Sequence, residues 1–171
     1  MPIRGMNHAV LYVRDANRTA DFMERMLGFQ RLDAVGIMPQ IQGVAFMRAD
    51  GSNNDHDLAL FSVGPDAADS LAGTGMVGLY HISWEVNSLR DLISYGHKLE
   101  EEGALVGGSD HGTTRALYAR DPDGIEFELV WVVPETLLTV DDAPTTRELN
   151  LEADIERFGL DTPGRQPQFF V

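Results

Sequence analysis

The chain of 171 residues contains no cysteine. Disulfide bonds, thiolate metal ligands and cysteine nucleophiles are therefore excluded, and we expect a cytoplasmic protein because such chains are typical of reducing compartments. No apolar run is long enough to cross a bilayer, and the start MPIRGMNHAV does not have the layout of a secretory signal. These absences predict a protein that is neither exported nor embedded in a membrane.

Basic residues are also few, with 13 Lys and Arg against 27 Asp and Glu and a net charge of −14. A field this negative repels phosphate backbones and anionic lipids, which argues against nucleic acid and membranes as partners. The length suits one domain, or two small fused units, with a hydrophobic core that needs no disulfide.

The first half of the sequence predicts a strand, a helix and three more strands. A strand-like run at residues 8–15 leads into an amphipathic pattern at residues 16–29, which ends at Gly28. Three strand-like runs follow, and the last of them is residues 58–63 (LALFSV). Residues 64–78 carry the Gly, Pro, Asp and Ser of a linker.

The second half repeats this order of elements. Residues 79–86 (LYHISWEV) alternate sides as a strand does, which puts His81, Ser83 and Glu85 on one face. A helical pattern at residues 88–103 comes next. Three strand-like runs follow, at residues 104–108, 114–121 and 125–133.

The repeat predicts an α+β fold of two tandem βαβββ modules, at about residues 6–64 and 79–133, within a single domain of residues 1–133. Residues 134–171 lie outside the repeat and form a C-terminal extension. Within this extension, residues 146–158 are predicted to form one helix.

The repeat also pairs equivalent positions. His8 and His81 open the two modules, with an offset of 73 residues (8 to 81). The last strands align with an offset of 69 residues (59 to 128), which makes Ala59 equivalent to Glu128. Because twisted sheets built from repeated units tend to curl about a shared cleft, we expect His8, His81 and Glu128 to converge.

The side chains at these three positions are suited to a metal ion. A carboxylate in an apolar strand is costly to bury unless it is paired or bound to a metal. Two imidazoles and one carboxylate leave three positions of an octahedral ion open, which is the arrangement of non-haem Fe(II) oxygenases. Zinc hydrolases use the same ligand types, so this set alone does not name the metal.

The repeated plan, with the turn DPDG at residues 121–124 followed by Glu128, resembles the vicinal oxygen chelate superfamily. This superfamily includes glyoxalase I, antibiotic-resistance thiol transferases and type I extradiol dioxygenases. The resemblance covers residues 6–133 and implies a curled mixed β-sheet around a metal cleft, with helices outside. Glyoxalase I normally supplies a fourth metal ligand where this chain has Ala59, so the chain departs from that pattern as the extradiol dioxygenases do.

Three further residues resemble positions of the extradiol family. His56 stands just before the last strand of the first module, similar to the histidine that acts beside bound oxygen as an acid and base. His111 and Tyr118, in HGTTRALYARDPDG, follow the order of the family's C-terminal signature. The resemblance implies that Tyr118 donates a hydrogen bond to the substrate and that His111 assists its deprotonation or the product steps.

The function implied by this resemblance is extradiol cleavage of a catechol-type aromatic by O2 in aromatic catabolism. The enzyme would be of the single-domain kind, with Fe(II) as its metal and Mn(II) as the alternative. Two other functions stay open: a metalloenzyme of the glyoxalase I or thiol-transferase type, and a metal-free protein that binds a drug or another small molecule. We expect a homodimer or larger homo-oligomer, because small modules often pair through sheet edges or helices.

Overall fold

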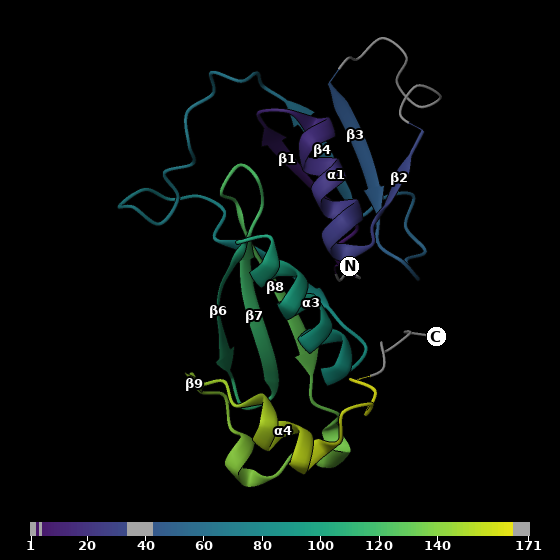
Figure 1. Cartoon of the computed structure of the whole chain (residues 1–171), viewed down its shortest axis with the longest axis vertical. Coiled ribbons are helices and arrows are strands. Elements are labelled where there is room, and N and C mark those ends of the chain that lie inside the picture. Colours follow the sequence, from purple (N-terminus) through teal and green to yellow (C-terminus); the bar gives the residue numbers. More distant parts are fainter. Residues whose placement is uncertain (1–2, 4, 34–42, 166–171) are drawn as a thin grey trace. The chain divides into compact units, whose positions relative to one another are not determined.

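The structure is a computed structural model that describes residue 3 and residues 5–33 and 43–165. This part of the chain contains three α-helices and two mixed sheets, one of four strands and one of five (Figure 1). The predicted α+β class is therefore confirmed. None of the helices found among the described residues is both long and apolar enough to span a membrane.

Contacts divide the chain into two compact units. The first comprises Met1–Ser70 together with Asp121–Gly124, and the second comprises Leu71–Arg120 together with Ile125–Val171. The division after Ser70 falls inside the expected linker. Each unit has a sheet and a core of its own.

The first unit contains one helix and a four-stranded sheet in the order β1-β4-β3-β2. β1 runs parallel to β4, and the other neighbouring strands are antiparallel. Its elements are β1 (Ala9–Val13), α1 (Ala16–Leu27), β2 (Gln30–Leu32), β3 (Val44–Arg48) and β4 (Leu58–Ser62).

Local sequence explains where α1 begins and ends. The side chain of Asp15 caps its start by accepting a hydrogen bond from the backbone N–H of Asn17. Gly28 ends it with a φ of 71°, a left-handed conformation that a residue without Cβ adopts at little cost. The buried face of α1, which includes Phe22 and Met23, packs on β3 and β4.

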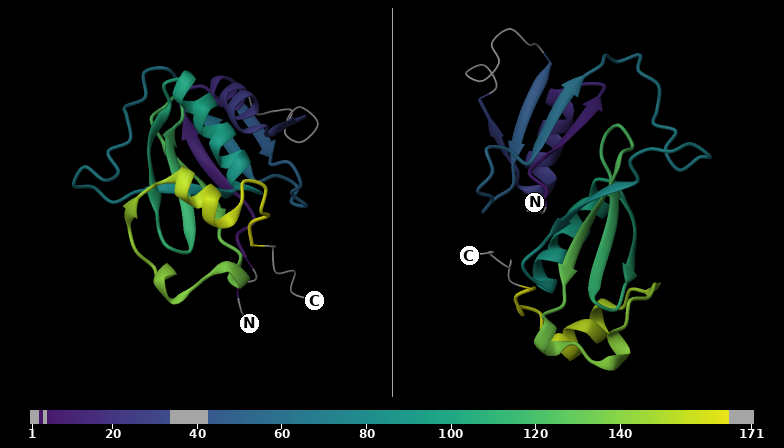
Figure 2. Two further views of the ribbon diagram at one scale, coloured as in Figure 1. Left: turned by 60° about the horizontal axis from the view of Figure 1, so that its bottom comes forward. Right: turned by 180° about the vertical axis from the view of Figure 1, so that it is seen from behind.

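The second unit repeats this arrangement with the sheet order β5-β8-β7-β6-β9. β5 runs parallel to β8, and α3 lies along one face of the sheet (Figures 1 and 2). The leucines of its stripe, Leu89, Leu92 and Leu99, are buried. The elements that repeat the first unit are β5 (His81–Glu85), α3 (Leu89–Glu101), β6 (Leu105–Asp110), β7 (Thr114–Arg120) and β8 (Glu126–Val132).

The strand register confirms the predicted equivalence of positions. In the first unit, Val10 pairs with Ala59 across β1 and β4. In the second unit, Ser83 pairs with Glu128 across β5 and β8. Val10 and Ser83 each stand two residues after the histidine of their module, so Ala59 occupies in one sheet the position that Glu128 occupies in the other.

The C-terminal extension belongs to the second unit. It begins with two short 3-10 helices, Glu135–Leu137 and Val140–Asp142, and continues with β9 (Arg147–Glu148) and α4 (Leu151–Phe158). The predicted helix at residues 146–158 is therefore wrong in its start. Residues 147 and 148 instead pair with β6, and Asn150 caps α4 through its side chain.

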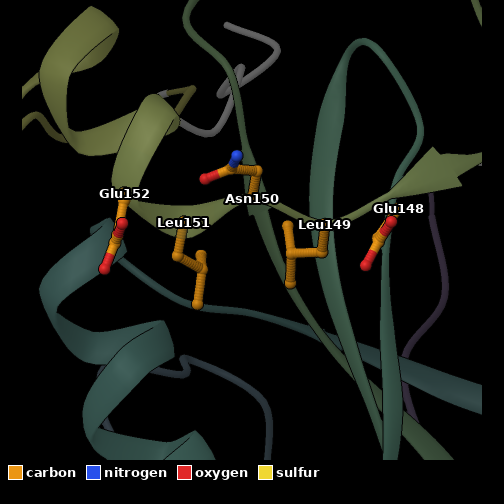
Figure 3. Close-up of a pocket in the computed structure, with 5 residues that line it drawn as sticks. All are labelled: Glu148, Leu149, Asn150, Leu151 and Glu152. Atoms are coloured by element: carbon orange, nitrogen blue, oxygen red, sulfur yellow. The ribbon is translucent and has the colours of Figure 1, made fainter.

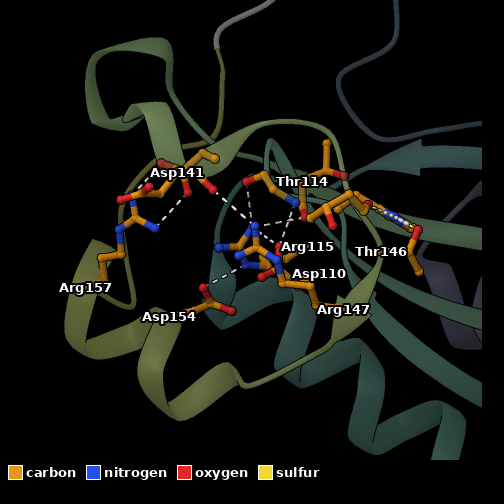
Figure 4. Close-up of polar contacts among 12 residues, drawn as sticks. Asp110, Thr114, Arg115, Asp141, Thr146, Arg147, Asp154 and Arg157 are labelled. Atoms are coloured by element: carbon orange, nitrogen blue, oxygen red, sulfur yellow. Dashed lines mark hydrogen bonds and ion pairs between the residues drawn. The ribbon is translucent and has the colours of Figure 1, made fainter.

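A buried ion pair connects the extension to the sheet, and a second pair lies within the extension (Figure 4). Arg115, which is 2% exposed, contacts Asp110 at 2.8 Å and Asp154 of α4 at 2.7 Å. Arg157 of α4 pairs with the buried Asp142 at 2.6 Å. These hydrogen bonds from Arg157 hold the pKa of Asp142 well below its ordinary value.

Replacing Asp154 should weaken this attachment. Asp154→Ala removes one of the two carboxylates on buried Arg115, and we expect a loss of about 1.5–3 kcal/mol in the free energy of unfolding, the size of a hydrogen bond to a charged group. Urea unfolding followed by the fluorescence of Trp131, which contacts Phe158 of α4, measures the loss.

The control is Asp161→Ala, since Asp161 also pairs with an arginine, Arg90, but both side chains are exposed. Water already solvates such a pair, so unfolding of this variant should stay close to that of the parent chain. Equal losses in the two variants would contradict the role assigned to burial.

Candidate functional site

The predicted site residues form two clusters, one in each unit. His8 and His56 belong to the first unit, and His81, His111, Tyr118 and Glu128 belong to the second. Neither unit by itself contains all three predicted metal ligands. Within the ranges that the structure describes, no group of three or more histidines and acids is placed to hold a metal ion.

In the first unit, two histidine rings stand together. His8 directly precedes β1, and its ring centroid lies 4.4 Å from that of His56, which precedes β4. Phe46 of β3 packs edge-on against His56 at 5.0 Å. Burial lowers the pKa of His56, and the neighbouring imidazole of His8 lowers it further, so His56 is neutral at pH 7.

In the second unit, strand pairing collects side chains on one face of the sheet. Tyr118 of β7 and Ser83 of β5 both pair with Glu128 of β8. His81 shares the face of Ser83 because side chains two residues apart on a strand point the same way. Its Nε2 lies 3.6 Å from Oε2 of Glu128.

The hydroxyl of Tyr118 has two hydrogen-bond partners. Burial, followed by the charge of Glu128 and a hydrogen bond with it, raises the pKa of Tyr118 to about 12. The same hydroxyl lies 2.8 Å from Nε2 of His111. Tyr118 is therefore a neutral phenol at pH 7. Its hydroxyl can donate a hydrogen bond to Glu128 or to His111.

Residues of the extension hold His111 in place. Its Nδ1 lies 3.0 Å from the backbone carbonyl oxygen of Thr145 and 3.3 Å from the hydroxyl of Thr146. A carbonyl oxygen only accepts hydrogen bonds, so Nδ1 carries a proton. In the neutral ring, Nε2 therefore accepts a hydrogen bond from the hydroxyl of Tyr118. The extension thus sets the orientation and the tautomer of a predicted catalytic residue.

The second-unit cluster fits a divalent metal ion. Nδ1 of His81 is buried and has no hydrogen-bond partner among the described residues. Glu128 is 8% exposed, and in this part of the chain no lysine or arginine pairs with it. Two atoms that bind one ion at about 2.1 Å lie at most about 4.2 Å apart, so the 3.6 Å between His81 and Glu128 is compatible with a shared ion.

One contact of the DPDG turn at residues 121–124 was not predicted from the sequence. Asp123 accepts hydrogen bonds from the backbone N–H and the guanidinium of Arg14, both at 3.0 Å. Within the first unit, this turn therefore binds the residue next to the cap of α1. No local pattern could show it, because 109 positions separate the two residues in sequence.

A pocket lies outside both clusters, at the start of α4 (Figure 3). Its lining consists of Glu148, Leu149, Asn150, Leu151 and Glu152. This lining includes no histidine and none of the predicted site residues. The two histidine clusters are therefore the better candidates for chemistry.

Comparison with known sequences identifies the family. A profile of the Glyoxalase/Bleomycin resistance protein/Dioxygenase superfamily matches residues 5–129, and the chain belongs to this superfamily. Catechol-2,3-dioxygenase of Bacillus subtilis (strain 168) is 27% identical over 158 residues, which are 90% of this chain and 52% of that protein. The chain thus spans about half the length of this curated relative.

Solved structures show the same fold. A glyoxylase/bleomycin resistance protein/dioxygenase domain from Frankia sp. EAN1pec matches with a TM-score of 0.62 and 22% identity, over 77% of this chain and 93% of that one. A mutant of the fosfomycin resistance protein FosX from Listeria monocytogenes, complexed with Mn(II) and 1S,2S-dihydroxypropylphosphonic acid, matches with a TM-score of 0.58 and 19% identity, over 82% and 97%. Proteins with different activities therefore share this fold.

Glu128 should control the ionisation of Tyr118. Glu128→Gln removes the charge repulsion but not the burial, so the pKa of Tyr118 should fall below about 12 and stay above its ordinary value of 10.0. The ultraviolet absorbance of tyrosinate, titrated in the metal-free protein, measures this pKa. The difference from the titration of Tyr118→Phe gives the part of the absorbance change that belongs to Tyr118.

A matched control is Glu126→Gln on the same strand, because Glu126 raises the pKa of Tyr118 less than Glu128 does. This variant should shift the titration far less than Glu128→Gln. An unchanged titration in Glu128→Gln would contradict the contact between Tyr118 and Glu128.

Proposed function

We propose that the chain is an extradiol dioxygenase that cleaves a catechol-type aromatic with O2 at a non-haem Fe(II) centre held by His8, His81 and Glu128. The observation that carries this proposal is the strand register, in which Ala59 takes the position equivalent to Glu128. A methyl group cannot bind a metal. The chain thus offers three protein ligands, and an octahedral ion keeps three positions for reactants.

The residues present suit such a centre in charge and ligand type. When bound, Fe(II) would supply Lewis acidity that lowers the pKa of a substrate phenol and would bring the two reactants together. Glu128 contributes a negative charge that is buried in a strand and paired with histidine His81. Mn(II) is the alternative metal, and the Mn(II) bound to the FosX structure supports it.

His56 acts as the acid and base in this proposal. Its pKa lies below the ordinary value, so at neutral pH the ring is ready to accept a proton. Protonated, it can stabilise negative charge that develops on oxygen and then return the proton. The adjacent Phe46 restricts water on one side of the ring.

Tyr118 and His111 act on the substrate diol. Tyr118 remains a neutral phenol and donates a hydrogen bond to a substrate oxygen. Before it does so, the diol can pass a proton to the Tyr118 hydroxyl while this hydroxyl passes its own proton to Nε2 of His111, so that Tyr118 stays neutral. This relay would remove the second hydroxyl proton of the diol or assist the product steps.

The substrate proposed is a small aromatic diol, and the product is its ring-opened semialdehyde or keto acid. The catechol-2,3-dioxygenase of Bacillus subtilis supports this substrate class. We further propose that the protein works as a homodimer or larger homo-oligomer, because small modules often pair through sheet edges or helices.

Iron reconstitution tests the function directly. After anaerobic loading with Fe(II), the protein should hold stoichiometric iron and convert catechols and O2 to yellow ring-opened products, measured by visible absorbance and oxygen uptake. Glu128→Ala should lose both iron and activity. A fully loaded protein that leaves mono- and bicyclic catechols unchanged would contradict the proposal, and a protein that takes up no divalent metal would favour a binding protein.

His56 should affect turnover without affecting the metal. We expect His56→Ala to lower kcat by about 10²- to 10⁴-fold, the usual contribution of a general acid or base, with unchanged iron content. The matched control is His97→Ala, an exposed histidine on α3 that should keep the parent rate. Lost iron in His56→Ala would reassign His56 to metal binding.

A further inference from the structure

A buried carboxylate starts a chain of hydrogen bonds that ends at His8. Asp57, which is 8% exposed, accepts from the backbone N–H of Ala49 at 2.8 Å through Oδ2. Its Oδ1 accepts from the hydroxyl of Ser52 at 2.8 Å and from Nδ2 of Asn54 at 2.7 Å. An ionised carboxylate only accepts, so the direction of the hydrogen bonds around Asp57 is determined.

This direction determines the orientation of the Asn54 amide. Its nitrogen donates to Asp57 and also to the backbone carbonyl oxygen of Asn7 at 2.8 Å. Both partners are acceptors, and an amide oxygen in that place would face two other oxygens. The oxygen of Asn54 is therefore left to accept, which it does from Nδ2 of Asn7 at 3.3 Å.

The orientation of Asn7 follows in turn. With its nitrogen donating to Asn54, its Oδ1 lies 2.7 Å from Nδ1 of His8. An amide oxygen only accepts, so Nδ1 of His8 must carry the proton. In the neutral ring, Nε2 then has the free lone pair that a metal requires.

We propose that Asn54 and Asn7 are positioning residues that transmit the hydrogen-bond direction of Asp57 to His8 and present its Nε2 to the metal. The metal part rests on the proposed function, whereas the tautomer of His8 does not. A partner on the second nitrogen of a ligating histidine fixes the ring and raises its basicity. The second unit lacks this device, because Tyr80 precedes His81 and Nδ1 of His81 has no hydrogen-bond partner within the described ranges.

Nuclear magnetic resonance of the metal-free protein, with ¹⁵N-labelled histidine, reads the tautomer of His8. The parent chain should show a protonated Nδ1, and Asn7→Asp should keep it because a carboxylate also accepts. Asn7→Ala should lose this tautomer, and Asn54→Ala should lose it in part because the amide of Asn7 can then turn over. Asn53→Ala, in the same loop, is the matched control and should leave it unchanged, with amide spectra reporting the fold of every variant.

Calorimetric titration with Mn(II) tests the consequence for binding. Asn7→Ala should weaken the affinity about 10- to 100-fold, the usual effect of removing a partner of a ligating histidine, and Asn7→Asp should restore it. A protonated Nε2 in the parent chain, or an unchanged tautomer in both alanine variants, would overturn the proposal. If neither the parent chain nor any variant binds metal but the tautomers change as expected, the proposed function fails. The hydrogen-bond chain from Asp57 through Asn54 and Asn7 to His8 is then still supported.

Discussion

The candidate site depends on the parallel pairing of the first and last strand in each unit. β1 pairs with β4, and β5 pairs with β8, in a register that places Ala59 and Glu128 opposite the residue two positions after each histidine. A slip of one residue would turn every side chain to the other face of the sheet. The register is strongly specified because α1 and α3 bury the opposite faces of the two sheets. The cores therefore determine which side chains can act together.

The extension contributes to the same chemistry through buried charge. In a chain with an excess of acids, the scarce arginines Arg115 and Arg157 hold Asp154 and Asp142 in nearly dry surroundings. Such pairs are costly to separate. The Arg115–Asp154 pair secures the extension to the second sheet, and the Arg157–Asp142 pair joins two parts of the extension. Thr145 lies between Asp142 and Asp154 in sequence, and its backbone carbonyl oxygen accepts a hydrogen bond from Nδ1 of His111. The extension, which lies outside the repeat, thus orients His111, which lies within it.

Membership in the superfamily leaves the reaction open, because one fold can host several activities. The choice among them depends on individual positions. Ala59 removes the fourth protein ligand that a glyoxalase requires, and His56, with its lowered pKa, suits proton transfer at neutral pH. Tyr118, held neutral by burial and by Glu128, suits hydrogen-bond donation rather than attack. These three positions support the proposed oxygen chemistry on an aromatic diol.

The sequence by itself determined the order of elements in the two modules, the start and end of α1, and the equivalence of Ala59 with Glu128. These features follow from periodicity, from Gly28 at the end of the first helical pattern and from the offset of the repeat, all of which relate residues close in the chain or matching segments. Only the tertiary structure decided the start of α4, the Arg14 contact of Asp123 and the direction of hydrogen bonds from Asp57 to His8. Such contacts join residues far apart in sequence, as the 47 positions between Asn7 and Asn54 illustrate, and folding alone brings their donors and acceptors within reach.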